Sequence, residues 1–117
     1  MTDSSASGDA LVRMLAALAS PHRMRVVAAL AGGRNYVSRL ARELGISRAL
    51  LQVHLRKLEA VGLVSSDLEL SEDGKALKFY QVVPFAIELT PHVIREAART
   101  LSDLDAPDLD GQKGSKT

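Results

Sequence analysis

The chain has 117 residues, of which 46% are hydrophobic and 25% are charged, a balance typical of a single globular domain. It contains no cysteine, which excludes a disulfide scaffold, a thiolate metal site and a cysteine nucleophile. The formal net charge is only +1, but residues 10–66 hold nine basic residues against Glu43 and Glu59. This excess favours a polyanionic partner, although an ordinary solvated surface can have the same composition.

Polar segments without periodicity stand at both ends of the chain. Residues 1–9 and 105–117 are rich in Ser, Asp, Gly and Lys, and we expect both to be disordered, the second as an acidic and polar tail. The first lacks the apolar core of a signal peptide, and no apolar run approaches the roughly 20 residues that span a bilayer. We therefore expect a cytoplasmic protein whose one domain occupies residues 10–104.

Apolar residues at helical spacing begin the ordered part of the chain. They are Leu11, Met14, Leu15 and Leu18. This spacing predicts an amphipathic helix over residues 10–19. Ser20-Pro21 is a typical N-cap and first position of a second helix, which should end at Gly32-Gly33.

Two further helices are predicted on either side of a glycine turn. Asn35 can cap a short third helix over residues 36–44. Gly45 then provides a tight turn, and Ser47 can cap a fourth helix that runs to Gly62. Two helices joined by so short a turn form a helix-turn-helix.

The pattern changes to strands after the fourth helix. Residues 63–70 and 76–83 predict two strands, joined by a turn at 71–74 that ends in glycine. Thr90-Pro91 can cap a last helix over residues 91–103. The predicted order is α-α-α-α-β-β-α, a mainly α chain with one β-hairpin, which is the order of a winged helix-turn-helix.

The fourth helix carries the chemistry. Leu51, Leu55 and Leu58 lie on one side of its helical wheel, and the opposite side is basic, amide-bearing or small. Such a side can be a merely solvated surface, but after a helix and a glycine turn it suits the major groove of DNA. The residues predicted to contact bases are Arg48, Gln52, Val53 and Arg56, and Ala49 is expected to lie in the same DNA-binding surface. Those predicted to contact the DNA backbone are Arg39, Arg42, Ser47, Lys75 and Lys78.

Four short motifs occur in this order with unbroken spacing: ASPHR at 19–23, LARELGIS at 40–47, HLRKL at 54–58 and GLV at 62–64. Over residues 15–85 the chain resembles the ArsR/SmtB family of bacterial winged-helix repressors. The resemblance implies a homodimer formed by the first and last helices, with both recognition helices on one face of DNA. The apolar residues expected in this interface are Leu11, Leu15, Leu18, Ile94, Ala98 and Leu101.

The chain departs from the family at the metal sites. The family's thiolate box falls at Tyr36 and Ser38, and the last helix retains only His92 of the family's histidines. His92 and Glu96 could form half of a metal site completed across a dimer, but such a pair is more often an exposed helix surface. We therefore expect no cofactor, and a metal ion at this pair stays an alternative.

The function predicted is sequence-specific binding of double-stranded DNA. No nucleophile with an adjacent base, carboxylate cluster or phosphate-binding glycine loop points to an enzyme. We expect a transcriptional regulator, a repressor that binds a pseudo-palindromic promoter site as a homodimer and has no membrane partner. Two alternatives stay open: a metal-dependent regulator, for example of nickel, acting directly or with a partner protein, and a winged-helix protein-interaction module without DNA binding.

Overall fold

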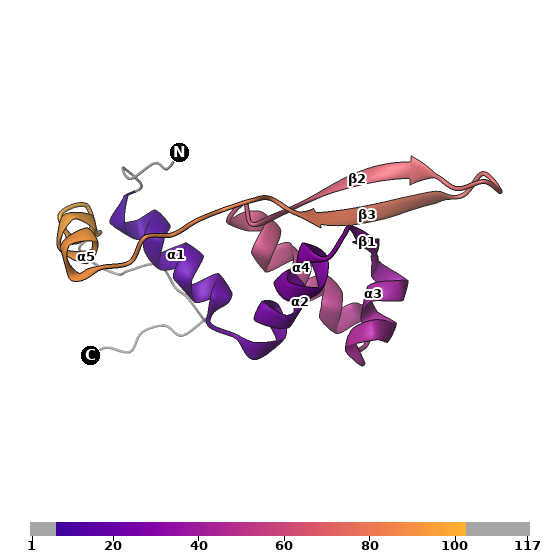
Figure 1. The fold of residues 1–117 in the computed structure, drawn as a ribbon, viewed down its shortest axis with the longest axis horizontal. Helices are drawn as coiled ribbons and strands as arrows, with labels where there is room; N and C mark the ends of the chain where they lie inside the picture. Colours follow the sequence, from indigo (N-terminus) through magenta and orange to yellow (C-terminus); the bar gives the residue numbers. More distant parts are fainter. Residues whose placement is uncertain (1–6, 103–117) are drawn as a thin grey trace. The chain divides into compact units, whose positions relative to one another are not determined.

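The computed structural model describes residues 7–102, which divide into two compact units (Figure 1). One unit is Ala17–Phe85, and the described part of the other joins residues 7–16 to residues 86–102. The predicted tail at 105–117 lies outside the described residues, as does most of the one at 1–9. None of the helices described is long and apolar enough to cross a membrane.

Helices and strands follow one another along the described chain in nearly the predicted order. They are α1 (Gly8–Leu18), α2 (Pro21–Ala31), β1 (Asn35–Tyr36), α3 (Val37–Leu44), α4 (Arg48–Ala60), β2 (Val64–Leu70), β3 (Ala76–Val82) and α5 (Pro91–Ala98). The mainly α chain with one hairpin is confirmed, and so is the helix-turn-helix formed by α3 and α4.

Three predicted hydroxyl caps begin helices as expected. The Ser20 side chain accepts a hydrogen bond from the Arg23 N–H, and the Thr90 side chain accepts one from the Val93 N–H. The Ser47 side chain accepts the Leu50 N–H at 3.0 Å and so begins α4. Each cap satisfies a backbone N–H that has no partner within the first turn of its helix.

A short strand, β1, was not predicted. Asn35 and Tyr36 pair with β3 opposite Tyr80 and Phe79, which gives an antiparallel sheet of order β1-β3-β2. The prediction that Asn35 caps the third helix is wrong: α3 begins at Val37, and its N-cap Tyr36 makes no side-chain cap. Two residues are too few for an alternating pattern, so only pairing with a distant strand defines β1.

The predicted bounds of the first and last helices differ from those in the structure. α1 begins at Gly8, so Gly8 and Asp9 are helical although the predicted helix began at residue 10. α5 ends at Ala98 and not at residue 103. After it the Leu101 N–H bonds to the Ala98 carbonyl three residues back, a tightened turn that ends the helix.

The core of the Ala17–Phe85 unit forms around one side of α4. Leu51, Leu55 and Leu58 are 0% exposed, as the helical wheel predicted. Other fully buried side chains come from α2, α3 and the base of the hairpin, namely Val26, Leu40, Leu63, Val64 and Tyr80. The hairpin runs in register from Val64 opposite Val82 to Leu70 opposite Ala76. Its outer end extends beyond α3 (Figure 1).

One polar residue, His54, is buried on the inner side of α4. It is 8% exposed, and its Nδ1 lies 3.3 Å from Arg23 Nη1. Because a guanidinium only donates, Nδ1 accepts and the proton of the neutral ring sits on Nε2. Within the part of the chain described, Nε2 is buried without a hydrogen-bond partner. Burial above all, then the charge of Arg23, lowers the pKa of His54, with smaller contributions from His22 and Lys57.

The unit that contains α5 is closed by contacts between its two helix ends. The Gly8 N–H donates to Thr100 Oγ1 at 2.6 Å, and the Ser102 N–H donates to Asp9 Oδ1 at 3.0 Å. The Ser102 hydroxyl also donates to Asp9, and these bonds lower the pKa of the Asp9 carboxyl. A Cβ at Gly8 would lie 2.1 Å from the carbonyl oxygen of Ala97, so the close approach requires glycine.

Replacing Gly8 by alanine is therefore expected to destabilise the protein. The clash with the Ala97 backbone should lower the free energy of unfolding by about 1–3 kcal/mol, a typical cost of overpacking. Gly32→Ala is the matched control, because its Cβ would meet only the Ala29 carbonyl oxygen at an ordinary 3.5 Å. Urea unfolding of both variants at one protein concentration measures the difference, and equal midpoints would show that α5 does not approach Gly8.

His54 is expected to make stability depend on pH. Its folded-state pKa lies below the unfolded value of 6.5, so its contribution is present above pH 6.5 and is lost as pH falls toward the folded pKa. His54→Gln, which cannot take up the proton, should flatten the unfolding free energy between about pH 7.5 and 5.5. His92→Gln, an exposed substitution on α5, should keep the wild-type slope. Parallel slopes for wild type and His54→Gln would contradict this assignment.

Candidate nucleic-acid interface

The turn between α3 and α4 fixes the direction of α4. α3 ends at Gly45, whose φ of 71° is left-handed, and the Ile46 N–H bonds to the Ala41 carbonyl at 3.1 Å. Ser47 then caps α4 directly. With Leu51, Leu55 and Leu58 buried, α4 presents its opposite side to solvent along the whole helix.

The predicted DNA-contact residues lie on this side of α4, at α3 and on the hairpin. All except Gln52, which is half-buried, are exposed: Arg39, Arg42, Ser47, Arg48, Ala49, Val53, Arg56, Lys75 and Lys78. Leu50 and Val53 are apolar yet 39% and 38% exposed, so the outward side of α4 is not uniformly polar.

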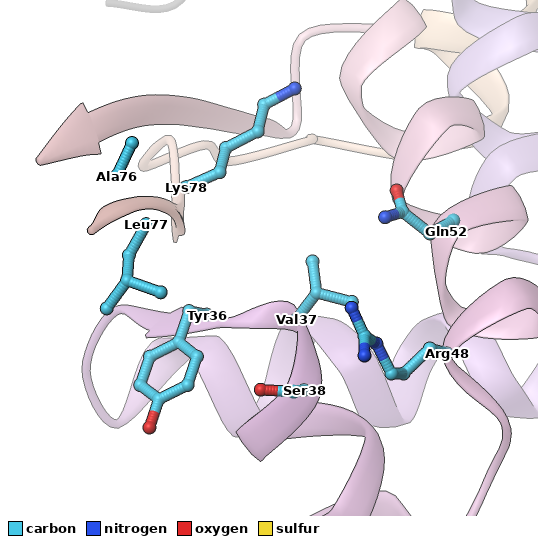
Figure 2. Close-up of a pocket in the computed structure, with 8 residues that line it drawn as sticks. All are labelled: Tyr36, Val37, Ser38, Arg48, Gln52, Ala76, Leu77 and Lys78. Atoms are coloured by element: carbon cyan, nitrogen blue, oxygen red, sulfur yellow. The ribbon is translucent and has the colours of Figure 1, made fainter.

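A shallow pocket of about 210 Å³ separates α4 from β3 and the start of α3. It is lined by Tyr36, Val37, Ser38, Arg48, Gln52, Ala76, Leu77 and Lys78. Figure 2 shows the Arg48 and Gln52 side chains extending from α4 toward this space, with the Tyr36 ring directed away from it. Gln52 thus lies on the flank of α4 that faces the hairpin.

The pocket has a cationic rim. Arg48 of α4 and Lys78 of β3 both line it, and none of the eight lining residues is acidic. Arg39 on α3 differs from them, because its Nε lies 3.5 Å from the Glu43 carboxylate. This ion pair is exposed and contributes little free energy, so Arg39 can exchange it for another anion at small cost. The arrangement suits a polyanion that passes between α4 and the hairpin.

The hairpin is braced by residues that sequence reasoning missed. The Arg34 guanidinium lies 4.4 Å from the centroid of the Phe79 ring and forms two hydrogen bonds with the Glu69 carboxylate, one of them at 2.9 Å. Arg34 thereby reaches from the start of β1 across β3 to β2, and it lowers the pKa of Glu69. Residues so far apart in sequence leave no local signal of such a contact.

The two hairpin lysines have different surroundings. Lys75 lies in the turn, where its N–H donates to Ser71 Oγ at 3.1 Å. The Ser71 hydroxyl also donates to Asp73, which lowers the pKa of that carboxyl and holds a negative charge near Lys75. The Lys78 ammonium lies 5.5 Å from the centroid of the Tyr80 ring, toward the base of the hairpin. Lys78 is therefore the lysine nearer to α4.

Among residues 7–102, no further ligand joins the metal candidates His92 and Glu96. His92 and Glu96 are exposed on α5, and Glu96 Oε1 lies 3.8 Å from Arg99 Nη1. His22 and His54 lie with ring centroids 5.3 Å apart, with Arg23 at the Nδ1 of His54. Across residues 7–102, no group of three or more His, Cys, Asp or Glu side chains could hold a metal ion.

The residues expected in a dimer interface are only partly covered. Leu11, Leu15 and Leu18 are half-buried on α1. On and after α5, Ala98 is exposed, Ile94 is 52% exposed and Leu101 is 43% exposed. α5 has no buried residue, so its apolar side chains remain accessible in the single chain.

Comparisons with known proteins agree with this geometry. A family model described as a helix-turn-helix domain matches residues 18–67. An uncharacterised HTH-type transcriptional regulator of Methanocaldococcus jannaschii is 35% identical over 86 residues, which cover 74% of this chain and 90% of the relative. The HTH-type transcriptional regulator CmtR of Mycobacterium tuberculosis is 42% identical over 60 residues, 51% of each chain.

Solved structures share the fold. A homodimeric winged helix-turn-helix DNA-binding domain of Mycobacterium bovis, described as a possible ArsR-family regulator, has a TM-score of 0.58 at 24% identity and covers 78% of this chain and 74% of its own. NolR of Sinorhizobium fredii has a TM-score of 0.54 at 24% identity, over 77% and 79%. The chain therefore belongs to the HTH-type, DNA-binding transcriptional regulators, with the winged-helix fold of ArsR-family proteins that its sequence resembles.

Proposed function

We propose that this regulator is a cytoplasmic repressor, without enzymatic activity, that occupies a pseudo-palindromic promoter site as a homodimer. The observation that carries the proposal is the solvent-exposed outer side of α4. It lies beside a pocket whose rim is cationic and whose lining holds no carboxylate. A helix of this kind enters the major groove, and occupancy of a promoter excludes other proteins from it.

The roles of the contact residues follow from their positions. Arg56 and Val53 lie on the outward side of α4 and meet base edges, together with Ala49. Arg48 and Gln52 contact bases from the flank of α4 that faces the hairpin. The DNA backbone is contacted by residues of α3, of the cap of α4 and of the hairpin, namely Arg39, Arg42, Ser47, Lys75 and Lys78.

The homodimer is supported by apolar residues that are exposed on and just after α5. Ile94 and Leu101 are about half exposed, and an apolar surface shared by two helices is ordinarily covered in a stable protein. A second copy is the occupant that fits, because a small chain gains buried area by association and the Mycobacterium bovis domain of like fold is homodimeric. A two-fold dimer presents two α4 helices, which suits a palindromic site.

The oligomeric state tests this part of the proposal. We expect light scattering at micromolar concentration to give twice the chain mass, and Ile94→Asp to weaken association at least tenfold, because the charge would enter an apolar interface. Leu68→Asp is the matched control, since Leu68 is 69% exposed on the hairpin and outside α1 and α5. A monomer mass for the wild type would contradict the dimer.

DNA binding should separate the two kinds of contact. On a duplex selected from random DNA, Arg56→Ala should cost about 1–3 kcal/mol and relax preference at one position of each half-site. Lys78→Ala should weaken binding to selected and scrambled duplexes alike. It should also reduce the slope of log affinity against log salt concentration by about one for each phosphate that the lysine no longer neutralises. Fluorescence anisotropy over a salt series measures both.

A basic residue away from this surface provides the control. Arg25→Ala removes an exposed charge from α2, which packs against the inner side of α4, and should change specific affinity much less than Arg56→Ala. Unchanged affinity and base preference in Arg56→Ala would show that the outer side of α4 does not read the DNA.

A further inference from the structure

Three adjacent apolar side chains occupy the outward side of α4 in its first two turns. Ala49 and Leu50 are exposed in the first turn, and Val53 follows them one turn later. Leu50 is 39% exposed and Val53 is 38% exposed, and neither is among the buried residues of α4. Packing within this chain therefore does not account for them.

The surroundings of this apolar strip (Ala49, Leu50 and Val53) are basic. Arg48 precedes it, Arg56 and Lys57 follow it within the helix, and the first carboxylate of α4 is Glu59, in its last turn. The surface thus fits an occupant that is apolar at its centre and anionic at its margins. A major groove with thymines has this character, because the C5 methyl groups lie on the groove floor between two rows of phosphates.

We propose that the apolar strip reads the C5 methyl groups of thymines, so that each half-site presents thymines to α4 beside the base contacted by Arg56. This inference rests on the DNA-binding function and specifies its chemistry. A methyl group in van der Waals contact with Val53 distinguishes thymine from cytosine at the same edge of the groove. Gln52 is half-buried on the flank of α4 that faces the hairpin. The outward side of the first two turns is therefore occupied by the apolar residues of the strip.

Replacing thymine by deoxyuracil tests the proposal, because the substitution removes only the C5 methyl group. A duplex is first selected from random DNA with the wild-type protein, and each thymine is then replaced singly. At the contacted positions we expect binding to weaken about fourfold, the equivalent of one buried methyl group at ~0.8 kcal/mol. Positions outside the half-sites should show no change.

Two variants assign the effect to the strip. In Val53→Ala the ratio of thymine to deoxyuracil affinity should fall to one at the position that Val53 contacts. Met24→Ala removes an apolar side chain that is even more exposed, on α2, and should leave every ratio at its wild-type value. Both substitutions are at exposed helix positions, so the fold should tolerate them.

The possible failures are distinct. Specific binding of the selected duplex with no deoxyuracil effect at any position would overturn methyl recognition while leaving DNA binding intact. Failure to enrich any duplex would contradict sequence-specific binding itself. A change in the mass of the DNA-free protein on Val53→Ala would assign the strip to a protein contact and overturn the proposal.

Discussion

The structure depends on the division of one helix into a buried and a bare side. α4 places Leu51, Leu55 and Leu58 at 0% exposure, and this burial of leucines against α2, α3 and the base of the hairpin holds the helix in place. The side chains left outside are then fixed in direction by the inner ones, since both belong to one rigid helix. The solvent-exposed side of α4 is therefore the side that is available to contact DNA.

The hairpin is positioned by a second and weaker set of contacts. β1 pairs with the middle strand, and Arg34 connects its start to Phe79 and to Glu69. These groups are exposed, so the ion pair adds little to stability, although it joins β2 to the residue that precedes β1 and neutralises the charge of Glu69. The hairpin lysine nearer to α4, Lys78, lies in β3, the middle strand of this sheet.

Local signals in the sequence were sufficient for most helices but not for their contacts. Ser20, Ser47 and Thr90 act as caps within three residues of the groups they bind, and the leucines of α4 repeat at helical spacing, so both could be predicted. β1, the Arg34 brace and the contact of Arg23 with His54 join residues distant in the chain. Such contacts depend on the tertiary fold and leave no periodic trace, which is also why the half-buried position of Gln52 beside the hairpin was missed.

We propose that DNA contacts the outer side of α4 together with the pocket between α4 and β3. Backbone amide shifts recorded by NMR during titration with a selected duplex test it most directly. We expect the largest changes at residues 36–38, 47–57 and 75–78, and little change on the exposed outer side of α2, at Met24 and Arg25. Shifts centred on α2 or α5, with α4 unaffected, would contradict it.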